Sequence, residues 1–140
     1  DAAANWTTLK SGDALGTITI TLAEGAASVR GRLTAGEGGA MPSGLGVYLI
    51  PAERERATDV LRYFVAPVEA DGKFAFNNLP PGRYLVLQQT LDPITDTIAK
   101  LRLPESAEAR TKLRRSAEAQ KTELQLKPCQ NLTSYELSVK

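Results

Sequence analysis

The chain has 140 residues, which is enough for one domain with a single modest core. Its 17 basic and 16 acidic side chains leave a net charge of +1, so composition gives no electrostatic reason to expect binding to nucleic acid. There is no histidine, and Cys129 is the single cysteine. The usual general base, the commonest metal ligand and any intramolecular disulfide are therefore missing. A Ser-His-Asp or Cys-His arrangement is excluded, and we expect no cofactor and no metal.

The sequence does not predict a membrane span, because its longest uncharged apolar run falls far short of about 20 residues. It opens on Asp1-Ala2-Ala3-Ala4, without a Met or a basic-then-apolar signal segment. We therefore expect the chain to be part of a longer protein.

Alternation of period two predicts strands through the first ninety residues. The first expected strand is 17–22, with Ile18, Ile20 and Leu22 on one face. Asp71-Gly72 predicts a tight hairpin turn, because such turns need residues that accept positive φ. Further strands are expected at residues 29–33, 47–50, 60–68, 73–76 and 83–89.

The pattern becomes helical after Leu91. Asp92 and Pro93 are typical of a helix start, and a first helix is expected to end near Leu101. A second helix is expected from Pro104 to about Gln120, with a thin apolar stripe that predicts a shallow cover over the sandwich. That stripe consists of Ala109, Leu113 and Ala117.

Period two returns at Leu124 and Leu126, and again at Tyr135, Leu137 and Val139. The predicted fold class is therefore mainly β, an antiparallel sandwich of about seven strands with a helical insertion before the last two. Residues 1–25 are interpreted as a strand and linker, either the tail of a preceding module or an edge strand of this sandwich. Residues 26–140 form the sandwich domain, with the insertion at 92–121.

Three pieces of the sequence together resemble the carboxypeptidase regulatory-like family. They are Ala27-Ser28-Val29-Arg30-Gly31-Arg32-Leu33, Leu45-Gly46-Val47-Tyr48-Leu49-Ile50-Pro51, and the stretch 70–84 with its D-G turn, F-x-F strand, L-P-P-G turn and following tyrosine, Tyr84. The resemblance implies a β-sandwich similar to transthyretin and to immunoglobulin domains. It also implies a non-catalytic module of a bacterial secreted, periplasmic or cell-envelope protein.

The implied function is structural support or protein interaction, with neighbouring domains of the same polypeptide or another envelope protein as partners. Carbohydrate binding is the alternative, because sandwiches of this general shape also bind sugars. An enzyme is the weakest hypothesis. It would need a carboxylate pair, either Glu53 with Asp59 or Asp92 with Asp96.

Five residues are candidates for a ligand or partner surface: Trp6, Tyr48, Arg110, Arg114 and Arg115. Trp6 stands in a polar stretch and offers a large flat face to a sugar or a partner. Tyr48 points opposite to Val47 and Leu49, so we expect it to contact the insertion. The arginines belong to a basic cluster whose ordinary explanation is a solvated helix face, and which could also hold an acidic partner.

Overall fold

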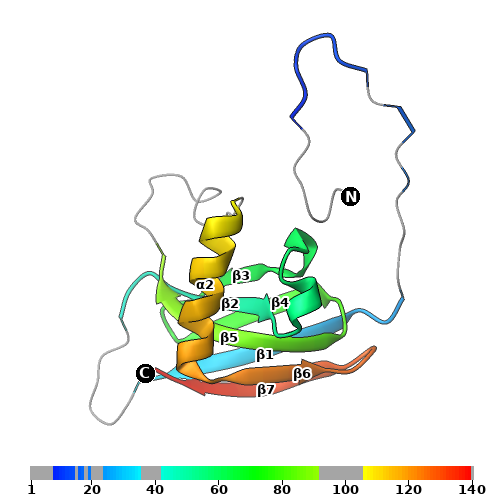
Figure 1. The fold of residues 1–140 in the computed structure, drawn as a ribbon. Helices are drawn as coiled ribbons and strands as arrows, with labels where there is room; N and C mark the ends of the chain where they lie inside the picture. Colours follow the sequence, from blue (N-terminus) through cyan, green and yellow to red (C-terminus); the bar gives the residue numbers. More distant parts are fainter. Residues whose placement is uncertain are drawn as a thin grey trace.

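The computed structural model describes residues 8–14, 16–17, 19, 24–35, 42–91 and 106–139. Within these ranges the chain forms seven strands, one α-helix and two 3-10 turns (Figure 1). The helix α2 comprises Ala107–Gln120, and the 3-10 turns comprise Arg54–Arg56 and Val60–Arg62. The strands are β1 (Ala27–Thr34), β2 (Leu45–Pro51), β3 (Phe64–Pro67), β4 (Lys73–Leu79), β5 (Gly82–Thr90), β6 (Glu123–Leu126) and β7 (Asn131–Ser138).

The strands form two sheets, one with the order β4-β1-β7 and the other with the order β3-β2-β5-β6. All pairs are antiparallel except β1 with β7, which is parallel. The two sheets share one hydrophobic core, and α2 lies over β2 and β5 on the outer face of the four-stranded sheet (Figure 1). The predicted sandwich of about seven strands, with a helix before the last two, is confirmed.

Alternating side chains of both sheets fill the core, as the period-two pattern predicts. Phe74 and Phe76 are 4% and 5% exposed, and their rings meet edge to face with centroids 6.1 Å apart. Gly31 lies opposite Phe74 on β1, and a Cβ on Gly31 would stand 2.4 Å from the Phe74 ring. Only glycine therefore leaves room for that ring between the sheets.

The predicted hairpin at Asp71-Gly72 is wrong, although the tight turn exists. Gly72 has a φ of +85°, and the Asp71 carboxylate accepts a hydrogen bond from the Lys73 backbone N–H at 3.1 Å. However, β3 pairs with β2 while β4 pairs with β1, so the turn carries the chain from one sheet to the other. Two strands that both carry core side chains can bury them in a sandwich by facing each other from opposite sheets.

The strand expected at 60–68 is shorter than predicted, because residues 60–62 form a 3-10 turn. The Asp59 carboxylate caps this turn by accepting from the Leu61 backbone N–H at 3.1 Å. Tyr63 and Phe64 point to opposite sides, as neighbours in extended chain must. Tyr63 packs beneath α2, whereas Phe64 packs against the core between the sheets.

Helix α2 begins after Ser106, whose hydroxyl accepts from the Ala109 backbone N–H at 3.1 Å, and ends at Lys121, where φ is +53°. Ala117 is completely buried and Leu113 is half-buried, so the helix forms a shallow cover as expected. The predicted stripe is wrong at Ala109, which is exposed, whereas its neighbour Arg110 is buried. The first expected helix, from Asp92 to Leu101, lies outside the described residues. Of the strand expected at 17–22, only Thr17 and Thr19 are described, and neither belongs to a strand.

Candidate functional site

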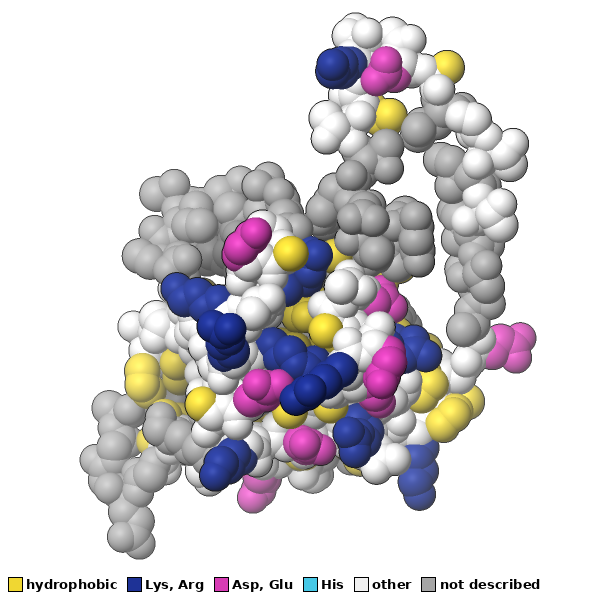
Figure 2. Space-filling view, viewed as in Figure 1, with side chains coloured by type: hydrophobic (Ala, Val, Ile, Leu, Met, Phe, Trp, Pro, Cys, Tyr) yellow, Lys and Arg dark blue, Asp and Glu magenta, His cyan; other side chains and the backbone are white. Residues whose placement is uncertain are grey.

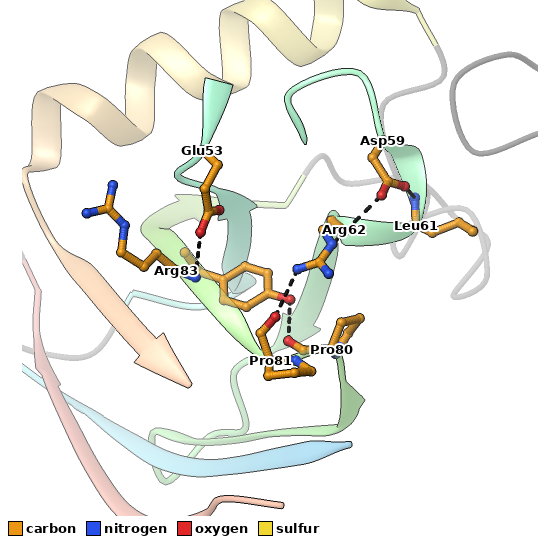
Figure 3. Close-up of polar contacts among 8 residues, drawn as sticks. Glu53, Asp59, Leu61, Arg62, Pro80, Pro81 and Arg83 are labelled. Atoms are coloured by element: carbon orange, nitrogen blue, oxygen red, sulfur yellow. Dashed lines mark hydrogen bonds and ion pairs between the residues drawn. The ribbon is translucent and has the colours of Figure 1, made fainter. Parts of the chain in front are cut away.

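One end of the sandwich is closed by polar contacts between the β2–β3 connection and the β4–β5 turn (Figure 3). Arg62 donates from Nη1 to the carbonyl oxygen of Pro81 at 3.0 Å, and its Nε lies 3.8 Å from the Asp59 carboxylate. The Tyr84 hydroxyl donates to the carbonyl oxygen of Pro80 at 2.7 Å. The L-P-P-G turn and Tyr84 belong to the most specific stretch of the family resemblance. Their hydrogen bonds hold the β4–β5 turn in place.

Glu53 belongs to the same network. Its Oε1 accepts from the Arg83 backbone N–H at 3.2 Å, as Figure 3 shows. Burial acts to raise the pKa of Glu53, but hydrogen bonds from the backbone N–H groups of Glu53 and Arg83, together with the charges of Arg83 and Arg62, hold the net pKa below its usual value. Glu53 and Asp59, the carboxylate pair of the enzyme hypothesis, thus lie at one end of the fold, each bonded to backbone N–H groups.

The basic cluster of α2 is divided between the sheet and the solvent, which corrects its interpretation as a solvated face. Arg114 donates to the carbonyl oxygens of Pro51 and Ala52, both at 2.7 Å, and pairs with Glu118 at 2.9 Å. Arg110 is only 7% exposed. The carbonyl bonds of Arg114 therefore dock the helix on the end of β2, and the stem of Arg110 is buried in the same contact.

Arg115 remains exposed on the outer side of α2. Figure 2 views the face of the molecule that carries α2, where dark blue and magenta side chains are interspersed. Such a mixture of signs gives the helix face no strong field of one sign. Of the three arginines expected at a partner surface, Arg110, Arg114 and Arg115, only Arg115 is exposed.

A small cavity of about 140 Å³ lies between α2 and the chain that precedes β3. Tyr63, Arg110 and Arg114 contribute to its lining. The Tyr63 hydroxyl donates to the carbonyl oxygen of Ala57 at 2.7 Å. Burial raises the pKa of Tyr63, while the positive charges of Arg114 and Arg110 act in the opposite direction.

A larger hollow of about 430 Å³ lies on the outer face of the three-stranded sheet, and we call it the cross-strand trough. Its floor is the row Phe74, Gly31 and Tyr135, which are paired across β4, β1 and β7. Because neighbours along a strand point to opposite faces, the residues on either side of this row point outward and form the walls. These wall residues include Arg30, Arg32, Lys73, Ala75, Ser134 and Glu136.

The sequence-predicted candidates are not brought together at the trough. Trp6 lies outside the described residues, and Tyr48 is half-buried against the cluster beneath α2, where we expected contact with the insertion. Sequence reasoning missed Arg30, Ser134 and Glu136. The alternation of Arg30 and Arg32 around Gly31 was visible, but their cross-strand neighbours depend on the parallel pairing of β1 with β7, which no local pattern shows.

A lone cysteine is usually a small buried residue, but Cys129 is not buried. It is exposed in the turn before β7, with a φ of +58°. Among the residues that the structure describes, no group of three or more acidic, Cys or His side chains is placed to hold a metal. None of the described helical segments is long and apolar enough to cross a membrane.

Comparisons with family models, with curated proteins and with solved structures found no match for this chain. The likeness to the carboxypeptidase regulatory-like family thus rests on the motifs of the sequence alone.

Proposed function

We propose that this chain is a non-catalytic structural or protein-interaction module of a larger secreted or cell-envelope protein. The motif resemblance supports this function, and the two sheets are compatible with the architecture that the resemblance implies. The absence of histidine from the sequence supports the non-catalytic part of the proposal. The partners are neighbouring domains of the same polypeptide or another extracytoplasmic protein.

The observation that carries the proposal is the unequal covering of the two sheets. The outer face of the four-stranded sheet is apolar at Tyr48, Ile50, Leu85 and Leu87, and α2 covers it. In the described part of the chain, no helix or strand covers the outer face of the three-stranded sheet, which bears the cross-strand trough. This hollowed polar face is the surface that we assign to a partner.

Crosslinking of the longer protein tests the proposal. A carbodiimide joins carboxylates to amines without a spacer, and the trough carries both groups at Glu136 and Lys73. We expect crosslinks from these residues to another domain or protein, in excess of those from Glu108 and Lys112 on α2. A module that gives no crosslinks and tumbles freely within the longer protein would contradict the proposed function.

Carbohydrate binding is the second candidate, because guanidinium, carboxylate and hydroxyl groups in the trough can all hydrogen-bond to sugar hydroxyls. It ranks second because both aromatic residues of the floor, Phe74 and Tyr135, pack against the core, and Phe74 is only 4% exposed. Titration of Trp6 fluorescence with plant, bacterial and starch polysaccharides tests this alternative. A saturable response would favour it, and no response to any of them would exclude binding near Trp6.

A further inference from the structure

The wall residues of the trough are arranged by strand register. Arg30 faces Ala75 on β4, and Arg32 faces Lys73 on β4 and Glu136 on β7. Adjacent strands lie about 4.8 Å apart, so the row Lys73, Arg32 and Glu136 spans about 10 Å across the sheet. One wall is therefore made of long charged side chains, whereas the opposite wall is low at its β4 end, where Ala75 stands beside Arg30.

The charges of the trough follow a definite order across the sheet. Arg30 and Arg32 stand at the centre on β1 and Glu136 stands on β7, while the β4 side carries both Glu69 and Lys73. Asp71 forms an ion pair with Lys73, and its carbonyl oxygen accepts from Arg32 Nε at 3.1 Å. The Arg30 side chain forms no hydrogen bond or ion pair with another described residue, so within the described part of the chain its guanidinium is available to a ligand.

A β-bulge adds hydroxyl groups beside Arg30. Val29 pairs with Leu132 and Gly31 pairs with Tyr135, so both Thr133 and Ser134 lie opposite Arg30. A bulge bends its strand and redirects a side chain, and bulges are frequent beside functional sites. Thr133 and Ser134 both belong to the lining of the trough. Their hydroxyls can donate to an acceptor that Arg30 also binds.

We propose that the cross-strand trough binds an extended segment of a partner polypeptide whose acidic side chain docks on Arg30 and whose flanking basic side chains face Glu136 and Glu69. This inference rests on the proposed function as a protein-interaction module and names the chemistry of the partner. Residues two apart on an extended segment share a face and lie about 6.8 Å from each other. Because Asp71 pairs with Lys73, the remaining charges of the trough run acidic-basic-acidic from Glu69 to Glu136. A basic-x-acidic-x-basic segment laid across the strands matches this order.

Other occupants fit this surface less well. A phosphate or a nucleic acid strand would meet Glu69 and Glu136 at both ends of the trough, and like charges repel. An apolar helix would have to desolvate Arg30 and Arg32, which it could not pair. Polypeptide segments supply both signs of charge at fixed spacing.

The test is an NMR titration of the 15N-labelled chain with acetyl-Gly-Lys-Gly-Glu-Gly-Lys-Gly-amide. Exposed ion pairs are individually weak, so a dissociation constant in the millimolar range is expected at low salt. We expect amide shifts at residues 30–32, 73–75 and 133–136, reduced at high salt because of screening. The matched peptide with Lys and Glu exchanged should bind at least about five-fold more weakly.

Three variants make the test specific. Arg30→Glu should abolish the shifts, and Ala75→Gln should weaken binding by filling the low wall without a change of charge. Arg115→Glu, the same charge reversal on α2, should leave binding unchanged. The inference would be overturned if both peptides bound equally or if the shifts were confined to α2. It would also be overturned if cellohexaose or maltohexaose, and not the peptide, shifted the amides of the trough. Crosslinks that join another part of this chain's surface to a neighbouring domain would support the proposed function and contradict the trough as the binding site.

Discussion

The Tyr84 hydroxyl ties the β4–β5 turn to the core by donating to the Pro80 carbonyl oxygen at 2.7 Å. Tyr84→Phe should therefore lower the free energy of unfolding by about 1–2 kcal/mol, because a partly buried carbonyl loses its donor. Tyr135→Phe is the matched control, since the Tyr135 hydroxyl makes no hydrogen bond to a described residue. Urea unfolding measures both variants, and equal midpoints would show that the Tyr84 bond does not stabilise the turn.

Glu53 should make stability depend on pH in acid. Its pKa is lower in the folded chain than the usual value, so the folded state favours the ionised carboxylate. This contribution is fully present above the unfolded pKa of about 4.3 and is lost as the pH falls through the folded pKa. Glu53→Gln should therefore be less stable than the parent at pH 7, with the difference narrowing below about pH 4. Urea midpoints that differ equally at both pH values would contradict this assignment.

Phe74 and Phe76 should be the most sensitive core positions. Both are almost fully buried, so Phe74→Ala and Phe76→Ala should each lower the free energy of unfolding by about 3–5 kcal/mol. Leu61→Ala is a suitable control because Leu61 is 66% exposed. If both Phe variants had urea midpoints close to the parent value, the two rings would not contribute substantially to the stability of the core.

At the level of elements, α2 should open before the strands. Its apolar contact is limited to Leu113 and Ala117, and a small cavity lies beside it. Hydrogen exchange should show residues 107–120 exchanging before those around Phe74 and Tyr84. Equal protection of both regions would mean that α2 belongs to the rigid core.

Arg114 should set how firmly α2 is docked, since its guanidinium binds two carbonyl oxygens of the chain at the end of β2. Arg114→Gln should raise the exchange rates within α2 about ten-fold and leave those of β1 and β4 unchanged, whereas Arg115→Gln should change neither. Exchange rates that respond equally to the two substitutions would contradict the docking role of Arg114.

Strand positions were predictable from the sequence where alternation was clear, as at Lys73–Leu79 and Glu123–Leu126. The assignment of strands to sheets was not. Asp71-Gly72 specifies a tight turn, but whether the flanking strands pair or separate depends on which core faces them, which is a property of the whole fold. For the same reason the burial of Arg110 and Arg114 was missed, because the carbonyls that Arg114 binds lie about 60 residues away in sequence.

For the whole molecule, we propose that the outer face of the three-stranded sheet, which bears the cross-strand trough, is the partner surface. Hydrogen exchange of the isolated chain, compared with the same residues in the longer protein, tests this most directly. We expect added protection in the longer protein at residues 30–32, 73–75 and 133–136, and unchanged exchange in α2. Added protection confined to α2, or identical exchange throughout, would contradict the account.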